Sequence, residues 1–463
     1  MSEQKTPYNQ IDFVIKAPRF RIVFSYMSDK GVAFVREYLL RLLKVTPCKP
    51  AQIAQYFGFN QHETEIALAD LENNKWIVWQ DDGLISLSAE GLRLFQSDGQ
   101  DSPQIPILKE FGGEYRMELL DNNFLQKNDC DKVRQQAIEL EIESKVLSES
   151  GEIARKTFQS RFRQLMEGEI ISLEDKDISL YKIDAIEPKG APDYFRFTQV
   201  FELLPATGEA KERHDVPAII HQDSIQQAIT DQLEKFGNHD NLSKLRNSIN
   251  ELGDEDTLKV LFGGRLDFAE FLKVYQKYEQ ENGLYFLGQI YHQEGLFKQI
   301  NSILNKLDKK TSKKFYWIAP SDIYWGKQRK IHDKVQNLAE KQKNKNYDIR
   351  LYLPLPAERN RHEKQEWQNQ FRDISEKVLY GFCEGFLDGN TEILFLEDEL
   401  AVVCYHAKLA DYPVTLPIGF MTTQVEKVRY ITNIVETYLN SAIFSDCDKN
   451  GAKQKDLGQL SRI

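Results

Sequence analysis

The residues with the clearest chemical pattern form a basic stretch between positions 305 and 350. It holds thirteen lysine or arginine residues against five aspartate or glutamate residues, an excess of eight positive charges in a chain of net charge −11. Aromatic residues interleave with them, and phosphate contacts combined with base stacking can bind nucleic acid. A solvated helix face is the alternative interpretation. The residues predicted to bind nucleic acid are Lys313, Lys314, Lys327, Arg329, Lys330 and Lys334.

Histidine and cysteine spacings point to no other chemistry. The eight histidines are dispersed and the five cysteines are scattered, so neither type has the spacing of metal ligands. No Gly-x-x-x-x-Gly-Lys-Ser/Thr segment occurs, so the sequence lacks a Walker-type nucleotide site. The sequence therefore predicts no metal and no cofactor.

The basic stretch lies where strand and helix patterns alternate. The apolar run 315–320 predicts a strand, and the polar segment from roughly 327 to 345 predicts a long helix. Residues 349–353 predict a second strand, and 391–405 predict a hairpin. This alternation predicts α/β packing with a partly parallel sheet.

Residues 30–96 have the pattern of three helices, a hairpin and a last short helix. Pro50 lies in the first turn of the second helix, Asn60 can cap the third, and Asp82-Gly83 separates two apolar runs as in a hairpin. This order resembles a winged helix-turn-helix domain, and residues 67–77 resemble the end of a recognition helix leading into the wing of a bacterial regulator.

The charge of this unit does not suit contact with phosphates. A winged helix normally places its third helix in the DNA major groove. Here that helix, 61–73, holds four carboxylates and no lysine or arginine, and the wing tip is Asp81-Asp82. Carboxylates facing phosphates would repel them. We therefore expect the unit to dock on a protein, or to contact DNA in an unusual way with help from basic residues between 16 and 44.

The segment 284–440 resembles the phospholipase D-like fold. The resemblance lies in 315–321, in 347–354 and in the hairpin 391–405. Active members carry His-x-Lys, four further residues and then Asp. The resemblance implies that the histidine attacks phosphorus and forms a covalent intermediate, while the lysine neutralises charge on the oxygens.

This motif is degenerate in the present chain. The pairs His332-Asp-Lys334 and His406-Ala-Lys408 both lack aspartate at the required offset. Aligning Asp398 with the hairpin turn instead puts Thr391 at the histidine position and Ile393 at the lysine position. We therefore expect a catalytically inactive domain. The alternative is a phosphodiesterase that uses His406 and Lys408.

Length and composition set the wider frame. A chain of 463 residues with 41% hydrophobic and 28% charged residues predicts two or three ordinary domains. The predicted segments are a winged helix-turn-helix domain at 1–106, a middle α+β segment at 107–254, a phospholipase D-like domain at 255–445 and a flexible tail at 446–463. Scattered thiols, the absence of a signal peptide and the absence of a long apolar run predict a cytoplasmic protein without membrane contact.

The predicted fold class is α+β multidomain, with an N-terminal winged helix and a C-terminal α/β phospholipase D-like domain. Inactive versions of that domain fused to winged helices resemble a class of transcription regulators, and such fusions occur in bacterial phage-defence cassettes. The resemblance implies a non-catalytic, nucleic-acid-associated regulator or sensor. A phospholipase D-type nuclease and a protein-docking adaptor remain the alternatives. The expected partners are nucleic acid, a protein bound by the winged helix, and a second copy in a homodimer.

Overall fold

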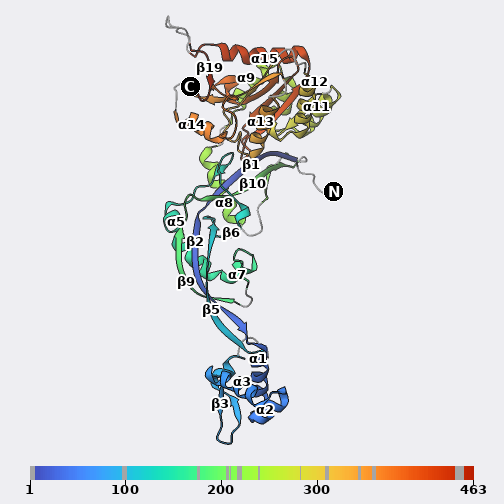
Figure 1. The fold of residues 1–463 in the computed structure, drawn as a ribbon. Coiled ribbons are helices and arrows are strands. Elements are labelled where there is room, and N and C mark those ends of the chain that lie inside the picture. Colours follow the sequence, from blue (N-terminus) through green and yellow to red (C-terminus); the bar gives the residue numbers. More distant parts are fainter. Residues whose placement is uncertain are drawn as a thin grey trace.

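The computed structural model describes a mixed α/β chain with several sheets. The described residues are 6–95, 102–174, 178–204, 208, 210–215, 222–237, 240–281, 283–307, 312–342, 346–356, 361–443 and 453–463. They form a body, a stalk of long strands and a small unit at the end of the stalk (Figure 1). None of the described helices is long and apolar enough to cross a membrane.

The body is built on an eight-stranded sheet in the order β12-β18-β17-β16-β13-β14-β15-β19. The pairs β13–β14 and β14–β15 are parallel, and the others are antiparallel. The predicted partly parallel sheet is therefore confirmed. Its strands are β12 (Leu284–Leu287), β13 (Lys313–Ile318), β14 (Tyr347–Leu355), β15 (Leu379–Cys383), β16 (Thr391–Leu396), β17 (Leu400–Ala407), β18 (Leu416–Thr422) and β19 (Asp456–Gln459).

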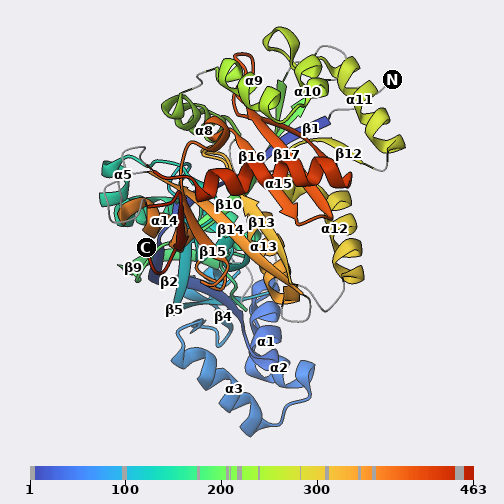
Figure 2. The same cartoon turned by 90° about the horizontal axis from the view of Figure 1, so that it is seen from above.

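Helices cover both faces of this sheet. Side chains alternate between the two faces along every strand, and those on both faces are mostly apolar and must be buried. One face, with Ile393 and Val403, packs against α8 (Gln222–Phe236), α9 (Leu242–Glu251), α10 (Glu255–Val260), α11 (Phe268–Gln280) and α15 (Val425–Asn440). The other, with Leu394 and Val402, packs against α12 (Glu294–Lys306) and α13 (Arg329–Gln342), with α14 (Arg361–Gln370) beside it. Figure 2 shows α15 lying across the strands.

The stalk is made of two long strand pairs that continue into one another. Near the body, β1 (Thr6–Ala17) pairs antiparallel with β10 (Asp193–Leu203), and β2 (Arg19–Gly31) pairs with β9 (Ile178–Pro188) farther out. Pro18, which lacks an amide donor, separates β1 from β2 where the chain passes between sheets. The remaining elements are β5 (Gln104–Met117), β6 (Phe124–Leu125), β7 (Cys130–Asp131), β8 (Ile138–Glu139), α5 (Ser144–Ser148), α6 (Ser150–Ser160), α7 (Phe162–Glu167) and β11 (Ala210–Asp215).

A small unit, residues 32–95, is inserted between β2 and β5, and we call it the tip unit. Gly31 pairs with Gln104, so the unit sits at the end of the β2–β5 ribbon, far from the body (Figure 1). The expected order of three helices, a hairpin and a last helix is observed. The elements are α1 (Phe34–Val45), α2 (Pro50–Phe57), α3 (Gln61–Asn73), β3 (Ile77–Trp79), β4 (Ile85–Leu87) and α4 (Ala89–Arg93).

The expected segment bounds differ from this arrangement in two places. The expected bound at 106/107 falls inside β5, because the tip unit interrupts a strand ribbon rather than preceding it. Residues 456–459 of the expected tail form β19, which pairs with β15 at the sheet edge.

Candidate functional site: a buried polar network around His406

His406 lies in β17 at the centre of the body sheet, and neighbouring strands bring two carboxylates to it. Glu392 of β16 pairs with Cys404 of β17, so Glu392, Cys404 and His406 share one face of the sheet. Asp322 follows β13 in a short loop. The side chains of His406, Asp322 and Glu392 have no exposed surface.

Hydrogen bonds join these side chains into one network. His406 Nδ1 lies 2.9 Å from Asp322 Oδ2, and His406 Nε2 lies 3.1 Å from Glu392 Oε2. The second oxygen of Glu392 accepts hydrogen bonds from the indole N–H groups of Trp317, at 2.7 Å, and Trp325, at 2.8 Å. Every polar atom of this pair of side chains, His406 and Glu392, thus has a partner.

The network holds His406 as a cation. Burial opposes the charge, but hydrogen bonds to Asp322, Cys404 and Glu392 outweigh it and raise the pKa of His406 well above its usual range. Burial also raises the pKa of the Cys404 thiol to about 11, so the thiol is protonated at neutral pH. One imidazolium between two carboxylates is a buried ion triad, which stabilises a fold only while all its members are present.

The same network anchors the stalk to the body. Thr415 Oγ1 donates to Asp322 Oδ2 at 2.8 Å, and Asn9 of β1 donates from its side chain to the Thr415 carbonyl at 2.8 Å. The Asp12 amide of β1 donates to the Lys327 carbonyl at 2.8 Å. The network is therefore continuous from the centre of the sheet to the first strand of the stalk.

A second polar cluster, around Arg196 of β10, fixes the same junction. Arg196 Nη1 lies 3.1 Å from Asp12 Oδ2, and its Nε lies 2.8 Å from Asp131 Oδ2. The guanidinium also donates to three carbonyls of residues 133–136. Asp131 also accepts from Arg329 of α13 at 2.8 Å. Arg329, which the sequence predicted to bind nucleic acid, thus joins the body to the stalk.

This geometry is unsuited to nucleophilic chemistry at His406. A histidine nucleophile needs a free, unprotonated ring nitrogen within reach of substrate. Both ring nitrogens of His406 are bonded to carboxylates, and the residue is fully buried. Lys408 lies just beyond β17. Its backbone amide, not its side-chain ammonium, donates a hydrogen bond to Asn241 Oδ1 at 2.8 Å.

The other motif positions are equally unsuited. Thr391 and Ile393 are buried on the opposite face of the sheet, under the helices that include α9. In the second pair, His332 lies in α13, and Lys334 is bonded to both carboxylate oxygens of Glu294 at 2.8 and 2.9 Å. The four motif positions thus give no exposed set of nucleophile and cation.

Glu392, Cys404 and His406 are also the one group of potential metal ligands among the described residues. Their donor atoms lie within 4.8 Å of one another. His406 and Glu392 already satisfy each other, however, and the indole donors occupy the other Glu392 oxygen. The donors are thus arranged for a proton-mediated network rather than for a metal.

The six cations predicted to bind nucleic acid lie in two groups. Lys313 and Lys314 begin β13. The other group lies beyond the other end of that strand, in the first turns of α13 or just before it, and consists of Lys327, Arg329, Lys330 and Lys334. Because a strand rises about 3.3 Å per residue, β13 spans roughly 20 Å between the groups.

Most of these cations have partners within the chain. Lys327 is largely enclosed by the protein, and this burial lowers the pKa of its ammonium group. Lys330 is exposed to solvent. The ion pairs are Lys313 with Glu399, Lys314 with Glu436, Arg329 with Asp131 and Lys334 with Glu294. All four of these carboxylates lie outside residues 305–350, so the described cations of the stretch do not form one continuous basic surface.

In the tip unit, the acidic residues of α3 divide into two kinds. Glu63 and Asn60 cap the helix reciprocally, at 2.8 and 2.9 Å, and Asp70 accepts from Arg36 of α1 at 2.8 Å. These carboxylates hold the fold together. Glu65, which accepts from the Gln61 side chain at 2.9 Å, and Glu72 are exposed and keep the surface of α3 acidic.

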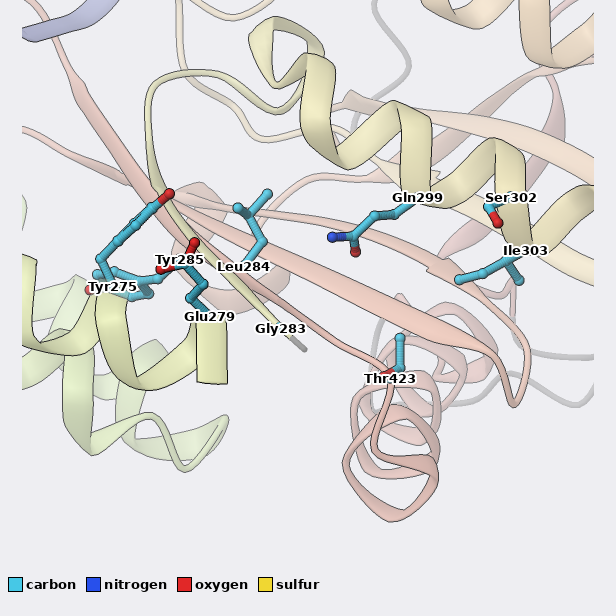
Figure 3. A pocket seen from close by; sticks show the side chains of 9 residues that line it. All are labelled: Tyr275, Glu279, Gly283, Leu284, Tyr285, Gln299, Ser302, Ile303 and Thr423. Carbon is cyan, nitrogen blue, oxygen red and sulfur yellow. The ribbon is translucent and has the colours of Figure 1, made fainter. Parts of the chain in front are cut away.

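A separate cavity of ≈470 Å³ lies between α11, α12 and the edge strand β12 (Figure 3). Glu279 is the one charged residue among those that line it. Gln299 and Ser302 come from α12, and Tyr275 from α11. A single carboxylate among amides, hydroxyls and apolar groups offers no catalytic set, and none of the sequence-predicted site residues lines this cavity.

Sequence reasoning found His406 but missed Asp322, Glu392 and the two tryptophans that complete its surroundings. One signal was available, since Glu392 is a charge inside the apolar run 391–396. A charged residue in a fully buried strand needs a partner.

No family model and no curated protein sequence significantly matches the chain.

Proposed function

We propose that this protein is a non-catalytic adaptor. In this proposal, an inactive phospholipase D-like body carries a stalk, and the stalk presents a winged helix-turn-helix unit to a protein partner. The observation that carries the proposal is the burial of His406. This residue is the histidine of the His-x-Lys pair that lies on a strand, and both of its ring nitrogens are paired with buried carboxylates.

The body supports this proposal by its order of elements and by its missing chemistry. From β13 to β17 the order is strand, helix, strand, helix, strand and hairpin, which supports the phospholipase D-like resemblance. Thr391 and Ile393 lie at the positions where active members carry histidine and lysine, and both are buried. Neither a hydroxyl under a helix layer nor an aliphatic chain can attack phosphorus or neutralise charge.

The tip unit supports the binding half of the proposal. It lies at the end of the β2–β5 ribbon, away from the body, so its helices are open to a large partner (Figure 1). The exposed carboxylates Glu65 and Glu72 on α3 disfavour a polyanion. A protein partner fits this charge better than DNA does.

We expect the protein to leave DNA intact. End-labelled duplex and single-stranded DNA would be incubated with it at about 50 and about 200 mM salt, with EDTA present, and separated on a gel. Lys408→Ala is the matched variant. The Lys408 side chain makes no hydrogen bond or ion pair with the described residues, but it belongs to the alternative catalytic pair. Shortened DNA with the wild type, and intact DNA with Lys408→Ala, would overturn the adaptor proposal in favour of a nuclease.

The same gel tests the nucleic-acid-associated regulator, which stays a prediction. An uncut band whose shift fades between the two salt concentrations would support it, because release of counterions weakens phosphate contacts as salt rises. Lys330→Ala is the informative variant, since Lys330 is exposed, whereas Arg329, which is also exposed, is paired with Asp131. The adaptor proposal expects no shift.

A further inference from the structure

The tip unit has an open apolar groove between α2 and α3. Its volume is ≈570 Å³. Ala54 of α2, Leu68 of α3 and Trp79 of β3 are among the residues that line it. The groove runs along the helix that a winged helix would normally lay against DNA.

Trp79 is the feature of this groove that most needs explanation. Its surface is 48% exposed, although an indole has a large apolar area whose burial is strongly favourable. Exposed tryptophans that flank apolar hollows are enriched among the residues that dominate protein–protein binding. Covering the groove and Trp79 would remove apolar surface from water, which is favourable.

Charge restricts what can cover it. Glu65 and Glu72 line the groove and are exposed, and no lysine, arginine or histidine lines it among the described residues. The other α3 carboxylates are engaged, Glu63 in the helix cap and Asp70 with Arg36. The wing tip, Asp81-Asp82, adds two acidic residues beyond Trp79. A ligand of complementary charge is therefore basic.

We propose that this groove binds an amphipathic helical segment of a partner protein, in which an apolar anchor is flanked by lysine or arginine. The inference rests on the adaptor function proposed above and names the chemistry of its partner. An apolar helix face laid into a groove is a common mode of recognition, and rim charges that match increase both specificity and the rate of association. A second copy is a poorer occupant, because the apolar face of its own basic helix α13 is buried in the body.

The experiment uses the full chain and three fluorescein-labelled helical peptides. The first carries leucine at helical spacing, one central tryptophan and flanking lysines. The second has glutamate in place of every lysine, and the third has serine in place of the tryptophan. We expect the lysine peptide to bind saturably by fluorescence anisotropy, and the other two at least about tenfold more weakly.

Variants of the chain assign the binding to the groove. Trp79→Ser and the double variant Glu65→Lys with Glu72→Lys should each weaken the lysine peptide at least about tenfold. Glu90→Lys is the matched control, because Glu90 is an exposed carboxylate on α4 that does not line the groove. It should bind the peptide like the wild type. Circular dichroism would check that all variants keep their helices.

Four results would overturn the inference. These are no saturable binding of the lysine peptide, equal binding of all three peptides, binding unchanged by the groove variants, and displacement of the peptide by duplex DNA or by self-association of the chain. With DNA still uncut, the first three would remove the groove as the docking site while leaving the non-catalytic assignment intact. Cut DNA would instead remove that assignment, whatever the peptides do.

Discussion

Replacing His406 with alanine is expected to lower the free energy of unfolding of the body by about 3–5 kcal/mol. The change leaves the Asp322 and Glu392 carboxylates buried without the cation between them. Both carboxylates keep other donors, but those donors are neutral, and two buried like charges repel each other. Thermal unfolding followed by circular dichroism should show a fall in Tm on the order of 10 °C for a body of this size.

Two further variants separate charge from packing. His406→Gln keeps hydrogen-bonding atoms near both carboxylates but has no charge, so its loss of stability should be smaller than that of alanine. Lys408→Ala removes a neighbouring side chain outside the network and should stay within about 0.5 kcal/mol of the wild type. An unchanged Tm in His406→Ala would show that the triad does not hold the sheet together.

Replacing Arg196 with methionine is expected to cost about 3 kcal/mol and to loosen the junction between stalk and body. Arg196 is the shared cation of Asp12 and Asp131 and also donates to carbonyls of residues 133–136. Methionine keeps much of the apolar contact of the arginine stem and loses every one of these bonds. Faster amide hydrogen exchange in residues 130–140 should accompany the loss of stability.

The matched control for this prediction is Arg134→Met. Arg134 also forms an ion pair, with Glu139 at 2.8 Å, but its side chain is 63% exposed. Exposed pairs contribute about 0–1 kcal/mol, so this variant should unfold almost like the wild type. Equal effects of the two substitutions would contradict a buried anchor at Arg196.

Local patterns predicted the elements that depend on local physics. Asn60 caps α3 as the sequence indicates, and the turn at Gly83 closes the short hairpin. Strands β13, β14, β16 and β17 of the body follow from apolar runs that are buried on both faces. In each case the decisive residues lie within a few positions of one another.

The pairing of the stalk strands escaped prediction because their partners lie far apart in the sequence. β2 pairs with β5 only after the whole tip unit, and its other neighbour, β9, begins at Ile178. Nothing inside 19–31 identifies those partners. The ordering of a strand by a partner so far away is a tertiary effect that local propensity does not encode.

The basic stretch and His406 were hard to interpret for the same reason. Glu294 and Asp131 lie outside 305–350, so the charge balance of the stretch omits the carboxylates that pair with its cations. Asp322 is 84 positions from His406 in the sequence. A sequence can show that a histidine lies on a strand, but not which carboxylates the fold brings to it.

The protonation state of His406 tests the non-catalytic assignment most directly. It can be measured by NMR of the chain labelled at histidine Cε1, with the His406 signal identified by its absence from His406→Gln. Because the pKa of His406 is raised, the stability it contributes is complete below the pKa of free histidine, about 6.5, and is lost as pH rises through the folded pKa. We predict an imidazolium signal that is still present at about pH 8. A signal that titrates near the pKa of free histidine would contradict the account, since a neutral imidazole is the form that can attack phosphorus.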